Sequence, residues 1–190
     1  MHNQPMRLDS NRQMLFCAVI SRSSEGKPSR IHHSLMVQTL KTKKERLLCS
    51  MRKVAVVYWS STGNTEAMAS AVAEGAKEKG AEVSLVTAAA FSPEQVNEYN
   101  AIAFGCPAMG AEQLEECEFE PMFSACEGRL SGKSIALFGS YGWGDGEWMR
   151  SWESRCQDDG ANLICDSVIC NESPDDDILS ACRALGASLT

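Results

Sequence analysis

The stretch Val54-Ala-Val-Val-Tyr-Trp-Ser-Ser-Thr-Gly-Asn-Thr-Glu66 changes character twice within a few residues. It begins with five consecutive apolar residues, three of them β-branched, which is typical of a strand buried on both faces of a parallel sheet. Small polar residues follow at 60–65, and from Glu66 onward apolar residues recur at helical spacing: Met68, Ala69, Val72, Ala73 and Ala76. The stretch therefore predicts a strand, a polar loop and a helix.

The polar loop has the composition of an anion site. It contains the hydroxyls of Ser60, Ser61, Thr62 and Thr65, the Asn64 amide and the flexible Gly63. The first N–H groups of a helix are unpaired and lie at the positive end of its dipole, so they attract an anion. Because the loop has no Lys or Arg, it does not match a nucleoside triphosphate loop, and the glycine pattern of a dinucleotide turn is absent too. The loop is suited to a single terminal phosphate. The alternative interpretation of the loop is an ordinary strand–helix turn capped by Ser or Thr.

The rest of residues 51–190 alternates between strand and helix patterns. Expected strands cover 81–86, 101–105, 134–140 and 162–170, and the helices after the first are expected at about 121–126, 147–158 and 175–185, with a short helical turn from Ser92. Alternating strands and helices imply right-handed crossovers and one parallel sheet between two helical layers. We therefore predict a three-layer α/β domain.

Three loops of unusual composition follow strands, at 60–65, 106–112 and 140–146. In parallel sheets ligands bind beyond the carboxyl ends of the strands, so these loops are expected to converge. Trp143 stands between two glycines, which suits an aromatic plate for a flat ligand better than a core residue. Met109 offers a polarisable thioether for the other face. Together the loops predict a site for a monophosphate nucleotide with a large planar ring.

Each of these residues also has an ordinary structural interpretation. Trp143 could fold back over the sheet edge, and Met109 could fill a gap in the core. Glu112 could accept a hydrogen bond from a ring imide, but in an acidic stretch it could equally belong to a solvated face.

Charge is unevenly distributed along the chain. Residues 1–52 hold ten Lys or Arg against three acidic residues, and residues 53–190 hold eight against twenty-two. The acidic part is expected to avoid nucleic acid and anionic membranes and to favour basic protein surfaces. No apolar run approaches the ~20 residues of a membrane span. The nine cysteines include no Cys-x-x-Cys pair and favour free thiols in a reducing compartment.

Residues 1–50 lack sustained periodicity, and we expect them to be mostly disordered. Their Arg-rich and Ser-rich composition is typical of an organellar import segment. The other interpretations are translation that starts at Met51 and an artefact of cloning. The domain division expected from the sequence is a basic extension at 1–50 and a folded domain at 51–190.

Four segments closely resemble the flavodoxins, most of all the short-chain flavodoxins of anaerobic bacteria. They are Val56-Val-Tyr-Trp-Ser-Ser-Thr-Gly-Asn-Thr-Glu66, Gly105-Cys-Pro-Ala-Met-Gly110, Glu118-Phe-Glu-Pro121 and Ala136-Leu-Phe-Gly-Ser-Tyr-Gly-Trp-Gly-Asp-Gly-Glu-Trp-Met149. The resemblance covers about 51–190. It implies a five-stranded parallel sheet of order 2-1-3-4-5, FMN as a non-covalent cofactor, and low-potential one-electron transfer between redox enzymes.

The resemblance also implies a set of cofactor contacts. The phosphate is expected on the 60–65 loop, the ring between Met109 and Trp143, the ring N3–H on Glu112, and a rotating peptide bond at Gly110. The full set of cofactor-binding residues that we predict is Ser60, Ser61, Thr62, Gly63, Asn64, Thr65, Pro107, Ala108, Met109, Gly110, Glu112, Ser140, Tyr141, Gly142, Trp143 and Gly144. The chain departs from close relatives at Ala111, where an acid is common, and at Pro107, where some relatives have a hydroxyl.

A carrier is favoured over an enzyme, because the sequence shows no nucleophile–base pair and no metal-ligand cluster. Its expected partners are redox enzymes with basic docking surfaces, which would meet the acidic residues Glu112, Glu115, Glu116, Glu118 and Glu120. We expect a cytoplasmic monomer, with organellar import as the alternative location. The rival functions are an NAD(P)H-dependent FMN or quinone reductase and a receiver-type signalling domain. A receiver domain would need an acidic cluster for Mg²⁺ and an aspartate at the end of the third strand, where this chain has Gly105 and Cys106.

Overall fold

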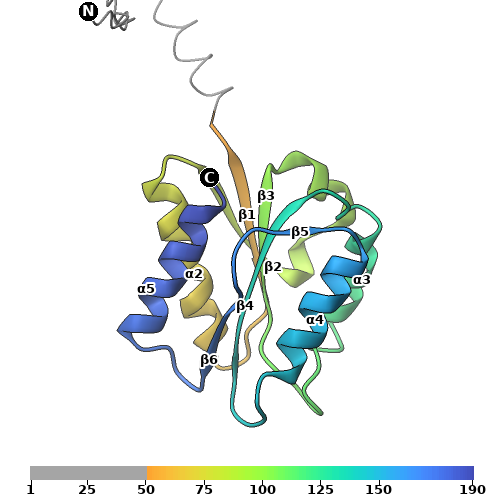
Figure 1. Cartoon of the computed structure of the whole chain (residues 1–190), viewed down its shortest axis with the longest axis vertical. Coiled ribbons are helices and arrows are strands. Elements are labelled where there is room, and N and C mark those ends of the chain that lie inside the picture. The colour runs from red at the N-terminus through yellow and green to blue at the C-terminus, as the bar shows by residue number, and fades with distance from the viewer. Residues whose placement is uncertain (1–50) are drawn as a thin grey trace, which may run out of the picture. The chain divides into compact units, whose positions relative to one another are not determined.

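The computed structural model describes residues 51–190, and the basic extension at 1–50, for which disorder was predicted, lies outside them. Residues 51–190 form one parallel sheet with helices on both faces (Figure 1). The strand order is β2-β1-β3-β4-β5, with β6 also paired to β4. The predicted three-layer α/β architecture and the order 2-1-3-4-5 are confirmed.

The strands follow the predicted apolar runs closely. Their bounds are β1 Lys53–Tyr58, β2 Glu82–Thr87, β3 Ala101–Gly105, β4 Ser134–Tyr141, β5 Asn162–Leu163 and β6 Val168–Asn171. The register aligns Tyr58 with Gly105, and Gly105 with Phe138. Because these strands are parallel, β1, β3 and β4 present their carboxyl ends at one edge of the sheet, at the bottom of Figure 1.

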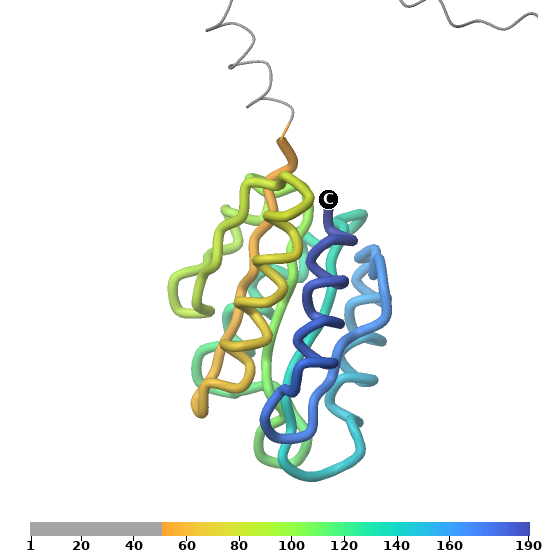
Figure 2. The backbone as a smooth tube through the Cα atoms, turned by 90° about the vertical axis from the view of Figure 1, so that its left-hand side faces the viewer, coloured from red at the N-terminus to blue at the C-terminus, as the bar shows by residue number. Residues whose placement is uncertain are grey.

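Two helices cover each face of the sheet (Figure 1). They are α2 Asn64–Glu78 and α5 Asp176–Ser188 on one face, and α3 Phe119–Glu127 and α4 Glu147–Asp158 on the other, with short 3₁₀ segments at Ala88–Ala90 and Pro93–Glu98. Helices α2 and α5 run side by side (Figure 2), because both lack a side chain where they meet. A Cβ atom on Gly75 would lie 1.9 Å from the Arg183 carbonyl oxygen, and one on Gly186 would lie 1.9 Å from that of Val72.

The prediction of a single fifth strand at 162–170 is wrong in one respect, because the structure divides this stretch into β5 and β6. Leu163 pairs with Ile135, and Val168 pairs with Phe138. The chain therefore advances five residues from 163 to 168, while the facing part of β4 advances only three, from 135 to 138. The two additional residues must leave the ladder, as in a β-bulge. The apolar Ile164 and Cys165 made the run look continuous in the sequence.

The apolar core has two halves, one on each face of the sheet. Large aromatic residues fill the α3/α4 side, where Trp152 packs edge-on against Phe119 and Phe123 with ring centroids 5.4 Å apart. Small residues such as Ala69 and Ala73 dominate the α2/α5 side and allow close packing. None of the helices in residues 51–190 is long and apolar enough to cross a membrane.

Candidate cofactor site

A cavity opens at the carboxyl edge of the sheet, between the loops that follow β1, β3 and β4. It has a volume of about 200 Å³. The predicted residues that line it are Ser61, Thr62, Asn64, Pro107, Ala108, Met109, Ser140, Tyr141 and Gly142. Ligand pockets commonly have volumes of ~300 Å³ or more, so a large planar ligand would extend beyond this cavity towards the open edge.

The amino end of α2 is the part of the site best suited to an anion. Gly63 precedes the helix with φ +90°, and no side chain caps the first N–H groups. Ser60 Oγ instead accepts the N–H of Gly63 at 3.1 Å and holds the loop in a turn. In residues 51–190 the other three α-helices each receive a carboxylate on these groups, from Glu115 at α3, Glu112 at α4 and Asp175 at α5. The ordinary side-chain cap considered from the sequence is therefore absent at α2.

A buried hydroxyl pair lies beside this helix end. Thr65 Oγ1 and Ser140 Oγ are 3.0 Å apart, and the two residues are 1% and 5% exposed. Two hydroxyls contain two protons, and their mutual hydrogen bond uses one of them. The second proton has no acceptor among residues 51–190, so an oxygen-rich ligand in the adjacent cavity would satisfy it.

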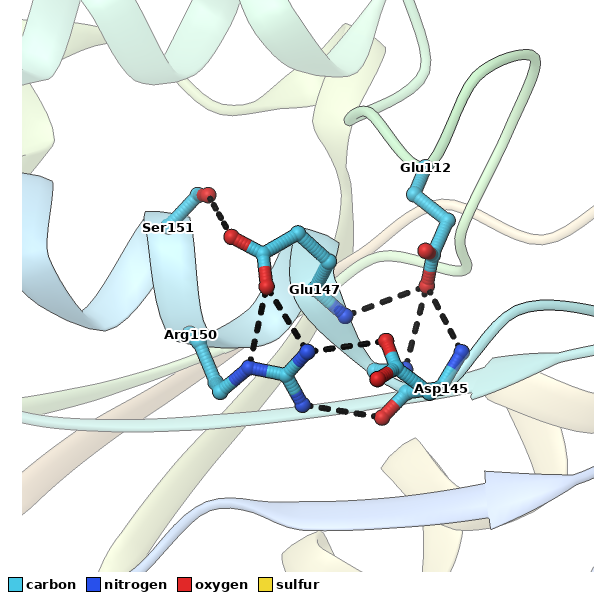
Figure 3. A network of polar contacts seen from close by, with 6 residues as sticks. Glu112, Asp145, Glu147, Arg150 and Ser151 are labelled. Carbon is cyan, nitrogen blue, oxygen red and sulfur yellow. Dashed lines mark hydrogen bonds and ion pairs between the residues drawn. The ribbon is translucent and has the colours of Figure 1, made fainter.

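The Glu112 carboxylate links two of the three loops (Figure 3). Its Oε1 atom accepts the backbone N–H groups of Asp145 at 3.3 Å and of Gly146 and Glu147 at 3.0 Å. These groups are at the amino end of α4, whose positive dipole favours a carboxylate. Arg150 binds Asp145 and Glu147 on the same turn (Figure 3). Glu112 therefore fixes the loop after β3 against the loop after β4, a role that the sequence did not reveal.

The residues predicted to flank a ring lie on these two linked loops. Met109 and Gln113 exchange backbone hydrogen bonds of 2.8 and 2.9 Å, which close a tight turn. Gly110 within this turn has φ +51°, a conformation that glycine adopts readily. Trp143 on the other loop is 59% exposed, whereas Trp148 and Trp152 are each 2% exposed. A large exposed aromatic side chain beside a cavity is available for stacking.

The acidic stretch is less available to partners than the sequence suggested. Glu115 is 6% exposed, and its two oxygens accept the N–H groups of Cys117, Glu118 and Phe119. Burial opposes ionisation of Glu115, but these hydrogen bonds prevail and hold its pKa below the ordinary value. The prediction that Glu115 belongs to a docking face is wrong, because its side chain is committed to the start of α3. Glu120 is engaged by Arg155 at 2.7 Å, and this pairing lowers its pKa.

Two residues that contribute to the site were not predicted from the sequence. Glu172 lines the cavity, and it adopts φ +58°, a strained conformation for a residue with a side chain. Its N–H donates to the Tyr141 carbonyl at 2.7 Å, which places β6 beside the cavity. Trp148 donates its indole N–H to the Cys106 carbonyl at 3.3 Å and so holds the start of the loop after β3. Neither contact has a local sequence signal, since both depend on residues that are distant along the chain.

The described region is rich in cysteine. The seven cysteines of residues 51–190 are all free, whereas Cys17 and Cys49, for which free thiols were also predicted, lie outside the described residues. Burial raises the pKa of Cys106, which therefore stays protonated, and its sulfur accepts the N–H of Glu115 at 3.3 Å. Within residues 51–190 no group of three or more His, Cys, Asp or Glu side chains is arranged to hold a metal ion.

Comparison with known proteins identifies the class to which this arrangement belongs. The family model described as flavodoxin matches residues 56–186. The flavodoxin of Megasphaera elsdenii is 45% identical over 133 residues, which are 70% of this chain and 95% of the relative. The flavodoxin of Clostridium beijerinckii is 43% identical over 121 residues, 64% of this chain and 88% of the relative. The solution structure of the two-electron reduced Megasphaera flavodoxin superposes with a TM-score of 0.67 and covers 72% of this chain and 97% of its own.

The chain belongs to the flavodoxin family. It is an FMN-binding electron carrier, in agreement with the resemblance seen in the sequence. FMN supplies a ring that takes up and releases electrons. The uncapped amino end of α2 and the spare hydroxyl proton of the Thr65–Ser140 pair fit its phosphate group, because both lack an acceptor among the described residues.

Proposed function

We propose that this protein is a low-potential, one-electron carrier that shuttles electrons between redox enzymes and has no catalytic activity of its own. The observation that carries this proposal is the amino end of α2, the one α-helix of residues 51–190 whose first N–H groups receive no hydrogen bond to a carboxylate. This end adjoins a cavity whose size suits only part of an FMN molecule. The exposed remainder would exchange electrons with a partner.

The phosphate would be held by neutral donors. We assign it to the N–H groups and side chains of the 60–65 loop: Ser60, Ser61, Thr62, Gly63, Asn64 and Thr65. Ser140 contributes through its hydrogen bond to Thr65. Pro107, Ala108, Tyr141 and Gly142 form the walls between this end and the ring.

The ring would lie between Met109 and Trp143, near the glycines 110 and 144. Glu112 has one oxygen on the amino end of α4, and its second oxygen, Oε2, has no partner among residues 51–190. This second oxygen is the acceptor that we assign to the ring N3–H. Gly110 has φ +51°, and a Cβ atom added to it would meet nothing within 4 Å. Because glycine adopts positive and negative φ values with little strain, we expect this peptide bond to be able to turn the Gly110 carbonyl towards the ring.

The surroundings of the site favour a low reduction potential. The loops at 60–65, 106–112 and 140–146 contain no Lys or Arg, and residues 53–190 hold 22 acidic residues in total against eight basic ones. The protein therefore offers little that would stabilise additional negative charge on a bound ring. We also place the protein in the cytoplasm as a monomer, with basic redox enzymes as partners.

Titration with FMN and with riboflavin tests the site. We expect the full chain to retain FMN through gel filtration and to bind riboflavin, which lacks the phosphate, at least about tenfold more weakly. An anaerobic reductive titration should then show two separate one-electron steps. A protein that refuses FMN would refute the assignment, and rapid oxidation of NADPH without a reductase would favour the rival reductase function.

A further inference from the structure

The turn between β6 and α5 lies beside the phosphate end of the cofactor site. Helix α2 follows β1 and helix α5 follows β6, so both begin at the carboxyl edge of the parallel sheet, and they run side by side (Figure 2). The turn at 172–175 therefore passes next to the start of α2. The cavity lining agrees with this position, because Glu172 contributes to it together with Thr62 and Asn64.

The backbone of this turn is fixed at both ends. Glu172 has φ +58°, and its N–H donates to the Tyr141 carbonyl at 2.7 Å. A residue with a side chain stays in such a conformation only where the surrounding structure requires it. At the other end Asp175 caps α5 by accepting an N–H of its first turn at 2.9 Å, and the ring of Pro174 restricts φ just before the cap. Ser173, between these anchors, has little freedom to move.

From this fixed position Ser173 contacts the first residue of α2. Its hydroxyl donates to the side-chain oxygen of Asn64, Oδ1, at 3.4 Å. An asparagine amide carries an acceptor oxygen on one side and two N–H donors on the other. With Oδ1 engaged by Ser173, the donors on Nδ2 have no partner among residues 51–190. Because Asn64 lines the cavity, these donors are available to an anion bound there.

We propose that Ser173 is a positioning residue for the cofactor phosphate. It holds the Asn64 amide so that the amide presents its donors, and not its oxygen, to the phosphate. An amide free to turn would have to be ordered when the cofactor binds, and ordering a side chain weakens binding. Phosphate as the bound anion rests on the proposed function. The contact is longer than the ~2.7–2.8 Å most common for O–H···O hydrogen bonds, so we expect it to orient Asn64 while adding little to the stability of the fold.

Substitution of Ser173 tests the proposal by comparing FMN with riboflavin, which has no phosphate. Ser173→Ala in the full chain should weaken FMN binding about threefold to tenfold and riboflavin binding by less than about twofold. Ser173→Thr keeps the hydroxyl and should bind FMN within about twofold of wild type. Ser180→Ala, at another exposed serine near the start of α5, is the control and should change neither affinity. Since Ser173 is exposed, the urea midpoint should stay the same in all three variants.

A double-mutant cycle tests whether Ser173 acts through Asn64. If it does, Ser173→Ala has nothing to orient once Asn64 is alanine. Its effect on FMN binding should then fall below about twofold. A serine that contacts the phosphate directly would keep its full effect in the Asn64→Ala background.

A third measurement does not require the cofactor. In the FMN-free protein, ¹⁵N relaxation reports the mobility of the Asn64 side-chain amide, and Asn64→Ala assigns its signal by removing it. We expect this amide to be more mobile in Ser173→Ala than in wild type or in Ser180→Ala. The proposed positioning can therefore be checked even in a protein that binds no flavin.

Four results would overturn the role of Ser173. They are unchanged FMN affinity in Ser173→Ala, an equal loss of FMN and riboflavin, the same loss when Asn64 is already alanine, and an Asn64 amide whose mobility does not respond to Ser173. Loss of FMN affinity in Ser173→Thr as large as in Ser173→Ala would also contradict a role of the hydroxyl. Failure of the wild-type protein to bind FMN would instead refute the proposed function, which separates the two conclusions.

Discussion

Glu112 Oε1 accepts the backbone N–H of Gly146 at 3.0 Å, and this contact joins the two loops between which the ring is expected (Figure 3). The neighbouring N–H groups of Asp145 and Glu147 bind the same oxygen. One carboxylate therefore stabilises the amino end of α4 and sets the separation of the Met109 and Trp143 loops. The start of α4 and the separation of the two loops therefore depend on the same atom.

Loss of the Glu112 carboxylate should lower both stability and FMN affinity. We expect Glu112→Ala to reduce the free energy of unfolding by ~1–2 kcal/mol, as for other lost helix caps. Glu112→Gln retains an oxygen for the cap and should lose less than half of that amount. Urea unfolding of the protein without FMN measures the effect. Equal stability of wild type and Glu112→Ala would show that the cap contributes nothing.

A substitution at Gly144, in the loop after β4, tests the same contact between the two loops. A Cβ atom there would lie 2.3 Å from Glu112 Cδ, and the residue has φ +91°. Gly144→Ala should therefore destabilise the protein by at least ~1 kcal/mol and weaken FMN binding. Gly128→Ala is the control, because Gly128 has φ −60° and a Cβ atom would meet nothing within 4 Å. A neutral Gly144→Ala would contradict the tight approach of the two loops.

The Thr65–Ser140 hydroxyl pair should couple stability to phosphate binding. We expect Thr65→Val, which keeps the shape and removes the hydroxyl, to cost ~1–3 kcal/mol of stability because it leaves Ser140 unpaired. It should also weaken FMN binding while leaving riboflavin binding almost unchanged. Combining it with Ser140→Ala should cost less than the sum of the single variants. Strictly additive effects would show that the two hydroxyls do not interact.

The parts of the fold that were predicted correctly have local signals. The run at 54–58 is apolar at every position, so a strand buried on both faces is its simplest interpretation, and β1 occupies Lys53–Tyr58. The division of the fifth strand has no such signal, because Ile164 and Cys165 are as apolar as the strands around them. The division arises because this stretch has more residues than the part of β4 with which it pairs, and that difference becomes visible only when the two strands are paired.

The site was predicted unevenly for a similar reason. The 60–65 loop and the loop around Trp143 carry their chemistry in consecutive residues, and the cavity does bring Ser61, Thr62 and Asn64 together with Tyr141 and Gly142. Glu172 and the capping role of Glu112 depend on contacts with residues about thirty positions away. Acidic residues also look alike in sequence, although Glu115 is buried as a cap while Glu116 is exposed.

Removal of the exposed indole should affect the cofactor far more than the fold. Because Trp143 is 59% exposed, we expect Trp143→Ala to change the free energy of unfolding of the FMN-free protein by less than ~0.5 kcal/mol. It should weaken FMN binding by ~1–3 kcal/mol, the range measured for stacking of planar bases on aromatic side chains. Leu85→Ala, at an exposed apolar residue on the edge strand β2, is the control. Unchanged FMN affinity in Trp143→Ala would remove Trp143 from the site.

Gly110 should control the separation of the two one-electron potentials. Valine is β-branched and tolerates φ +51° poorly, so Gly110→Val should prevent the Gly110 carbonyl from turning towards the ring. A lost hydrogen bond of ~1–2 kcal/mol corresponds to roughly 40–90 mV for one electron. Gly110→Asn, which tolerates left-handed conformations, should give a smaller shift. Identical potentials in all three proteins, determined by reductive titration, would exclude a role for this peptide bond.

Acid should destabilise the protein through Glu115 and Glu120. The pKa of each is held below the ordinary value of 4.5, at Glu120 by hydrogen bonding to Arg155, and at Glu115 by backbone N–H groups whose effect exceeds the opposing effect of burial. A carboxylate with a lowered pKa in the folded state contributes stability that is complete above its unfolded pKa and is lost as the pH falls through its folded pKa. The free energy of unfolding should therefore be level above about pH 5 and decline below about pH 4.5. Glu115→Gln should lower the free energy of unfolding at about pH 7 and flatten this decline. Glu118→Gln is the control. It should leave the pH profile as it is, because Glu118 is exposed and its carboxylate caps nothing. Parallel acid profiles for wild type and Glu115→Gln would show that the buried carboxylate does not contribute to acid sensitivity.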